Sequence, residues 1–170
     1  IYSEVKTMYR NKIEELIKWK NSKSRKPLII RGARQVGKTW LMQKFGKNYY
    51  EKCAYINFDS NNRMEELFST DFDIERIVQG LKIESGVNIE PENTLIIFDE
   101  IQEIPKALTS LKYFCENANK YHIVAAGSLL GVAMHEGTFF PVGKLDFMDL
   151  YPLSYEECLE ALGEKELVNL

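Results

Sequence analysis

The stretch Gly32-Ala33-Arg34-Gln35-Val36-Gly37-Lys38-Thr39 decides the fold class of this chain. It matches the pattern G-x-x-x-x-G-K-[ST] at every defined position and follows the apolar run Leu28-Ile29-Ile30. Glycines permit backbone conformations that turn successive N–H groups inward, toward phosphate oxygens. A helix that begins near Lys38 would point its unpaired N–H groups and the positive end of its dipole at the same phosphates. We therefore predict a phosphate-binding loop between a buried strand and a helix.

The residues of this loop are predicted to contact different parts of one nucleotide. Lys38 carries a full positive charge on a flexible stem, so we expect it to bind the outer phosphates and to take part in catalysis. Thr39 offers its hydroxyl to Mg²⁺. A nucleotide with several phosphates and Mg²⁺ are therefore the expected ligands. The candidate nucleotide-binding residues are Gly32, Ala33, Arg34, Gln35, Val36, Gly37, Lys38 and Thr39.

Two acidic residues, Asp99 and Glu100, directly follow an apolar run at 95–98 that is typical of a buried strand. In open α/β sheets, ligands bind outside the carboxyl ends of the strands. Asp99 is therefore placed to hold Mg²⁺ together with Thr39, directly or through water. Glu100 is placed to polarise a water molecule for attack on the γ-phosphate, so we predict it to be the catalytic base.

A second acid after the metal-binding Asp is typical of the P-loop branch that inserts an extra strand between the phosphate-loop strand and the metal strand. Residues 122–126 are predicted to form that extra strand, which ends at Gly127-Ser128. Two interpretations of Ser128 are open. Its hydroxyl either lies near the γ-phosphate or the attacking water, which would make it catalytic, or it is a turn residue at a strand end.

Apolar runs and helical periodicity alternate along the rest of the chain. This alternation indicates an α/β fold with a mainly parallel sheet. The basic segment 21–27 could contact phosphates, although such a run is more often a solvated connector. We expect helices at 8–20, 38–45, 64–68, 74–82, 106–117 and 154–162, and strands at 28–30, 53–58, 94–98, 122–126 and 145–150.

The composition indicates an ordinary globular domain. The chain has 170 residues, of which 45% are hydrophobic and 28% charged, and its net charge of -3 gives it no overall attraction to nucleic acid or anionic lipid. No apolar stretch is long enough to cross a bilayer, and the N-terminus does not read as a signal peptide. Cys53, Cys115 and Cys158 form no CxxC pair, which favours reduced thiols and a cytoplasmic location. His122 and His135 have no metal-ligand spacing, so we interpret both as incidental to function.

Taken together and in this order, the motifs resemble the AAA+-like (ASCE P-loop) ATPases of bacteria and archaea that carry a C-terminal nuclease-like domain of unknown function. The resemblance extends from about residue 8 to residue 163. It rests on the run 28–39 and on four further stretches, Phe98-Asp99-Glu100-Ile101-Gln102, Ala126-Gly127-Ser128-Leu129-Leu130-Gly131-Val132, Phe140-Pro141-Val142-Gly143-Lys144 and Leu150-Tyr151-Pro152-Leu153-Ser154.

The resemblance implies a three-layer sandwich with a five-stranded sheet of order 5-1-4-3-2 and ATP as the nucleotide. It implies one AAA+-like domain, with an N-terminal helix and linker at 1–26 and a P-loop core at 27–163, that forms the N-terminal part of a longer protein. Many relatives carry Arg where Lys144 stands, which puts a catalytic role of Lys144 in doubt. Arg34 and Gln102 are further candidates for contact with the phosphates.

Three functions are compatible with these features. The first is an ATPase that couples Mg²⁺-dependent hydrolysis to conformational change, and that is slow within these residues because no arginine finger is evident. The second is a nucleotide-gated binding module with little turnover. The third is the ATPase part of a DNA-processing protein, supported only by the resemblance and by the basic segment 18–26. Beyond ATP and ADP, self-association or a protein partner is expected.

Overall fold

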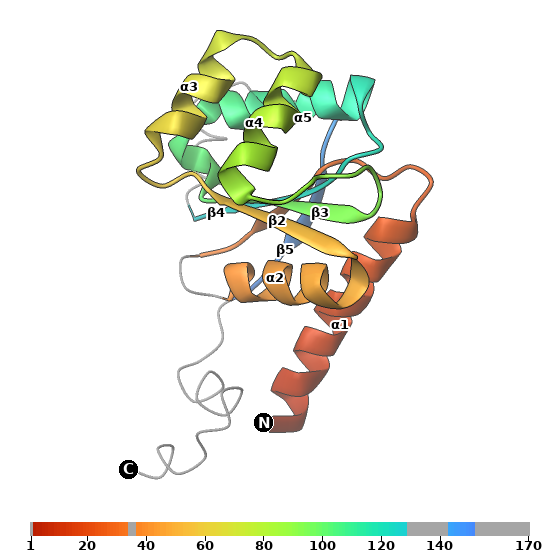
Figure 1. Cartoon of the computed structure of the whole chain (residues 1–170). Coiled ribbons are helices and arrows are strands. Elements are labelled where there is room, and N and C mark those ends of the chain that lie inside the picture. Colours follow the sequence, from red (N-terminus) through yellow and green to blue (C-terminus); the bar gives the residue numbers. More distant parts are fainter. Residues whose placement is uncertain (1, 34–36, 129–142, 152–170) are drawn as a thin grey trace.

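Five parallel strands form one sheet in the part of the chain that the structure describes (Figure 1). The computed structural model describes residues 2–33, 37–128 and 143–151, with side chains from residue 10 onward. The spatial order β2-β3-β4-β1-β5 confirms the predicted order 5-1-4-3-2 and the α/β class. The strands are β1 (Leu28–Arg31), β2 (Lys52–Asn57), β3 (Thr94–Asp99), β4 (His122–Gly127) and β5 (Asp146–Asp149).

Helices cover both faces of this sheet and make the predicted three-layer sandwich (Figure 1). One face is covered by α1 (Tyr2–Asn21) and α2 (Lys38–Tyr49). The other carries α3 (Asn62–Thr70), α4 (Ile74–Ser85) and α5 (Pro105–Asn117). A short 3₁₀ helix, η1 (Ile101–Glu103), follows β3 and was not expected. Within the described residues, none of the helices combines the length and the apolar character needed to span a bilayer.

The central strands β3 and β4 are buried along their whole length. Successive side chains of a strand point to opposite faces. Leu95 and Ile97 accordingly pack on the α1–α2 side, whereas Ile96 and Phe98 pack on the side of α3, α4 and α5. A parallel sheet covered on both faces needs apolar residues at every position, which explains why these strands read as continuous apolar runs rather than alternating ones.

Helix α2 is one turn longer than its sequence predicts, and Gly46 lies inside it. The backbone of Gly46 approaches the sheet closely, since a Cβ built there would lie 2.6 Å from Sγ of Cys53 and 3.3 Å from Leu95. Glycine weakens a helix by about 1 kcal/mol relative to alanine. Here its small size allows α2 to pack directly on β2 and β3, so tertiary packing outweighs local propensity.

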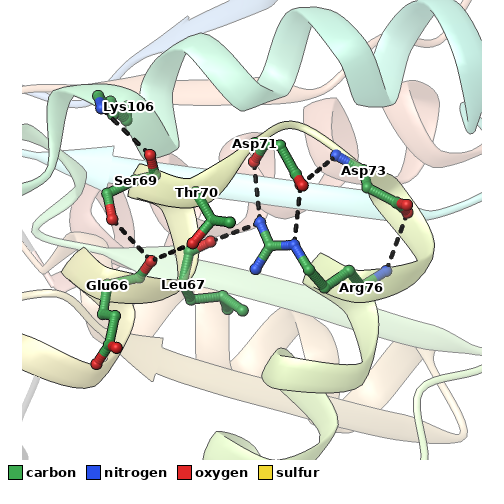
Figure 2. A network of polar contacts seen from close by, with 8 residues as sticks. All are labelled: Glu66, Leu67, Ser69, Thr70, Asp71, Asp73, Arg76 and Lys106. Atoms are coloured by element: carbon green, nitrogen blue, oxygen red, sulfur yellow. Dashed lines mark hydrogen bonds and ion pairs between the residues drawn. The ribbon is translucent and has the colours of Figure 1, made fainter.

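The turn between α3 and α4 is held by one arginine (Figure 2). Arg76 donates from Nε to the carboxylate of Asp71 at 2.9 Å and from Nη2 to the carbonyl of Leu67 at 2.8 Å. The side chain of Asp73 caps α4 by accepting from the backbone N–H of Arg76 at 3.2 Å. These contacts satisfy polar groups that a tight helix–helix turn would otherwise leave unpaired.

The segment after α1 is less solvated than its composition predicts. Residues 21–24 are exposed, but Arg25 is buried and donates to the carbonyl of Asn119, whose side-chain amide donates back to the carbonyl of Arg25 at 2.6 Å. Beside this pair, His122 is buried at the start of β4, with Nδ1 2.6 Å from the hydroxyl of Tyr50. Burial lowers the pKa of His122 to about 4, helped by the positive charges of Arg25 and Lys20. His122 is thus part of the packing between the sheet and its neighbouring segments.

We expect the free energy of unfolding to fall as the pH drops from about 6.5 toward 4. His122 has a lower pKa in the folded protein than in the unfolded chain, so its neutral form stabilises the fold fully above the ordinary value of 6.5. That contribution is lost as the pH falls toward 4. Urea unfolding at several pH values should show a weaker dependence in His122→Gln, whose amide cannot titrate. An equal dependence in both proteins would contradict a buried neutral imidazole.

Candidate functional site

The parallel pairing brings most of the predicted site residues to the carboxyl-terminal ends of the strands. The end of β1 leads into the loop that begins at Gly32, the end of β3 carries Asp99 and Glu100, and Ser128 follows β4. Arg31 pairs with Gly127 across β1 and β4, so Ser128 lies beside the start of the loop. Ser128 is partly buried, which is compatible with both interpretations of its role.

Lys38 is buried at the first position of α2, next to the loop that it is predicted to complete. Its ammonium donates to the carbonyl of Gly32 at 2.9 Å and to that of Ala33 at 2.5 Å. Burial lowers the pKa of Lys38, whereas the carboxylates of Glu100 and Asp99 act in the opposite direction. The charge of Lys38 is therefore held between the loop and the end of β3.

Gly37, directly before Lys38, has a φ of 84° in the left-handed region. Glycine adopts this conformation without the steric penalty that a Cβ brings. The second glycine of the motif thus sets the direction in which α2 starts.

The carboxylate of Asp99 accepts hydrogen bonds from three donors. Thr39 Oγ1 and the hydroxyl of Tyr55 each lie 2.6 Å from Oδ2, and the backbone N–H of Glu100 lies 3.0 Å from Oδ1. Asp99 is only 4% exposed. Buried carboxylates need such partners, because leaving water is costly for a charged group. The geometry thus joins the last residue of the loop motif to the end of β3.

Tyr55 is the member of this cluster that the sequence reasoning missed. It lies on β2, opposite Ile97 of β3. Burial, together with the hydrogen bond to Asp99, raises the pKa of its hydroxyl, which therefore stays protonated and donates. Alternation along β2 could have placed Tyr55 on the same face as Cys53, but the pairing register that brings it to Asp99 is not visible in one sequence.

Glu100 has an unusual backbone conformation, with φ 54° and ψ 42°. This left-handed conformation costs a residue with a Cβ about 1–2 kcal/mol. The side chain is held by Gln102, whose Nε2 lies 2.5 Å from Glu100 Oε2. Gln102, proposed from the resemblance to face the γ-phosphate, is thus a neighbour of the predicted base.

A second polar contact ties β5 to the start of the loop. The guanidinium of Arg31 makes a two-point ion pair with Asp149, at 2.8 Å and 3.2 Å. The backbone N–H of Leu150 donates to the carbonyl of Arg31 at 2.8 Å. Because Gly32 follows directly, the position of the loop depends on the end of β5. This pair could not be predicted from the sequence, since the two residues are 118 positions apart along the chain.

Lys144 lies near the amino-terminal ends of the strands, away from the loop. It precedes β5, whose first residue Asp146 pairs with Leu28 at the start of β1, and its ammonium is 3.6 Å from Glu116. The four residues of β1 separate this end of the sheet from the loop by about 13 Å. Within this chain, Lys144 is therefore badly placed to contact a nucleotide phosphate at the loop.

Outside the described residues lie Arg34, Gln35, Val36, His135, Cys158 and the helix expected at 154–162.

A family model described as an AAA domain matches residues 24–159. The chain belongs to this AAA domain family. No curated protein matches the sequence. The AAA domain assignment and the sheet order together make the chain an AAA-type nucleotide-binding domain with a P-loop ATPase fold.

Several solved structures share this fold. The Walker-type ATPase PABY2304 of Pyrococcus abyssi has a TM-score of 0.52 and 19% identity, over 92% of this chain and 58% of that one. ORC1 of Aeropyrum pernix, solved in complex with DNA, has a TM-score of 0.55 and 15% identity, over 94% of this chain and 49% of that one. Drosophila ORC bound to AT-rich DNA and Cdc6 has a TM-score of 0.53 and 15% identity, over 92% of this chain and 60% of that one. The chain thus spans about half to three-fifths of these proteins, and identities this low show the fold alone.

We predict that Lys38→Ala removes most ATP binding while the fold survives. The variant loses the buried ammonium that lies beside the loop, and with it the charge that would meet the outer phosphates. Calorimetric titration with ATP and Mg²⁺ measures the effect, and thermal unfolding monitors the fold. Lys44→Ala is the matched control, because Lys44 is an exposed lysine on the same helix, 4.7 Å from the ring centroid of Trp40. Unchanged ATP affinity in folded Lys38→Ala would refute the role of Lys38.

Proposed function

We propose that this domain binds Mg²⁺·ATP at the loop 32–39 and hydrolyses it to ADP and phosphate, coupled to a conformational change. The observation that carries the proposal is the 2.6 Å contact between Thr39, the last residue of the loop motif, and Asp99 at the end of β3. Two features that are 60 residues apart and would belong to one metal–nucleotide site are thereby in direct contact.

The donor set fits Mg²⁺. This ion prefers oxygen ligands and is usually held by one or two carboxylates together with substrate phosphates. Thr39 and Asp99 supply a hydroxyl and a carboxylate oxygen side by side. In the described residues, no group of three or more His, Cys, Asp or Glu side chains could hold a metal by itself. When bound there, Mg²⁺ would neutralise charge on the phosphates.

The chain's own residues have distinct parts in this mechanism. Lys38 would exchange its hydrogen bonds to the carbonyls of Gly32 and Ala33 for contacts with phosphate oxygens, and its positive charge would stabilise the transition state. Glu100 would accept a proton from the attacking water as the new bond to the γ-phosphorus forms and the bond to the bridging oxygen breaks. Ser128, beside the loop, is proposed to orient that water or the γ-phosphate.

A nucleotide-gated binding module with little turnover is the second candidate, and one contact favours it. Gln102 already donates to Glu100 Oε2, which reduces the capacity of that oxygen to accept a proton from water. A cytoplasmic location, self-association, a DNA-processing role and a C-terminal nuclease-like domain stay predictions from the sequence and its resemblance.

Replacement of Glu100 by Gln distinguishes the two functions. We expect Glu100→Gln to bind Mg²⁺·ATP like the unmodified protein and to hydrolyse it about 10²–10⁴-fold more slowly, since a positioned base contributes a factor of this size. Phosphate release under saturating ATP measures turnover, and calorimetry measures binding. Glu103→Gln, at an exposed position three residues along, is the control and should turn over normally. Normal hydrolysis by Glu100→Gln would refute its role as base, and an unmodified protein that binds ATP without turnover would favour the binding module.

A further inference from the structure

Tyr55 reaches the proposed metal site from a strand that carries no recognised nucleotide motif. It lies on β2 opposite Ile97, and Asp99 is two residues further along β3. Residues two apart on a strand share a face. Tyr55 therefore points to the side of the sheet that α2 covers, where Thr39 also lies, and its hydroxyl is 2.6 Å from Asp99 Oδ2.

Tyr55 and Thr39 donate to the same oxygen. A carboxylate oxygen has two lone pairs, so Oδ2 can accept from both hydroxyls at once. Thr39 can keep its hydrogen directed at Asp99 while its own oxygen lone pairs face a cation. The phenol of Tyr55 is held by a rigid side chain with few rotatable bonds, and it fixes Oδ2 from the β2 side. Oδ1 is fixed in turn by the N–H of Glu100.

We propose that Tyr55 is a positioning residue for Mg²⁺, which holds the Asp99 carboxylate in the orientation that the ion requires. This inference rests on the proposed function of the site and extends it to a third residue. Partners of this kind orient metal ligands and typically change metal affinity by about 10–100-fold when they are removed. In this role Tyr55 acts through its hydrogen bond to Asp99.

The test measures nucleotide binding as a function of Mg²⁺ concentration. In Tyr55→Phe, which loses only the hydroxyl, we expect the Mg²⁺ concentration for half-maximal ATP binding to rise about tenfold. ATP binding in EDTA should stay unchanged, because the loop and Lys38 are intact. If the role of Tyr55 were merely structural, Tyr55→Phe would have a lower thermal stability. The Mg²⁺ concentration for half-maximal ATP binding would then not rise while ATP binding in EDTA stayed unchanged.

Tyr50→Phe is the matched control. It removes a hydroxyl that is also hydrogen-bonded at 2.6 Å, but to His122 at the far end of the sheet. We expect its Mg²⁺ requirement to equal that of the unmodified protein. In an Asp99→Asn background, Tyr55→Phe should add little, because both residues act on the same ligand.

The outcomes separate the two proposals. Equal Mg²⁺ requirements in Tyr55→Phe and the unmodified protein would overturn the role of Tyr55, as would an equal rise in Tyr50→Phe. An unmodified protein whose ATP binding does not respond to Mg²⁺ at all would instead overturn the proposed metal site. A selective rise in Tyr55→Phe that disappears in the Asp99→Asn background would establish the positioning role.

Discussion

The hydrogen bonds to the buried carboxylate of Asp99 are the interaction on which the rest of the site depends. A carboxylate that is 4% exposed must be compensated by donors. Those donors come from the first turn of α2, from β2 and from the backbone directly after β3. They can meet only if β2 and β3 pair in their observed parallel register and α2 packs closely on both strands. The close approach of Gly46 to Cys53 and Leu95 is one requirement of that packing.

The charged groups next to this carboxylate, Lys38 and Glu100, are held by different kinds of partner. Lys38 is bound to loop carbonyls that a phosphate could replace, and Glu100 has a left-handed backbone with its side chain bound to Gln102. Arg31 and Asp149 join the start of the loop to the end of β5. In the proposed function, the carboxylate of Asp99 would hold the metal in a fixed position, while Lys38 could exchange its carbonyl partners for phosphate oxygens.

The α/β class could be predicted from the sequence because it rests on local patterns, whereas the strand order came from the family resemblance. The apolar runs of β3 and β4 indicate buried parallel strands, and the loop motif names Lys38 and Thr39 without any knowledge of pairing. The contacts of Tyr55 and Arg31 could not be predicted, since they depend on strand register over 44 and 118 residues of separation. The burial of Arg25 and His122 was missed for a similar reason, because polar residues appear solvated until their distant partners are known.

The most direct test of the account is a crystal structure of this protein with Mg²⁺ and a non-hydrolysable ATP analogue. We expect phosphates within the loop 32–39, with Lys38 Nζ moved from the carbonyls of Gly32 and Ala33 to phosphate oxygen. We also expect one metal ion beside Thr39 Oγ1 and Asp99, with the hydroxyl of Tyr55 still hydrogen-bonded to Oδ2. A nucleotide bound elsewhere, or a metal ion held without Thr39 and Asp99, would contradict the proposed site.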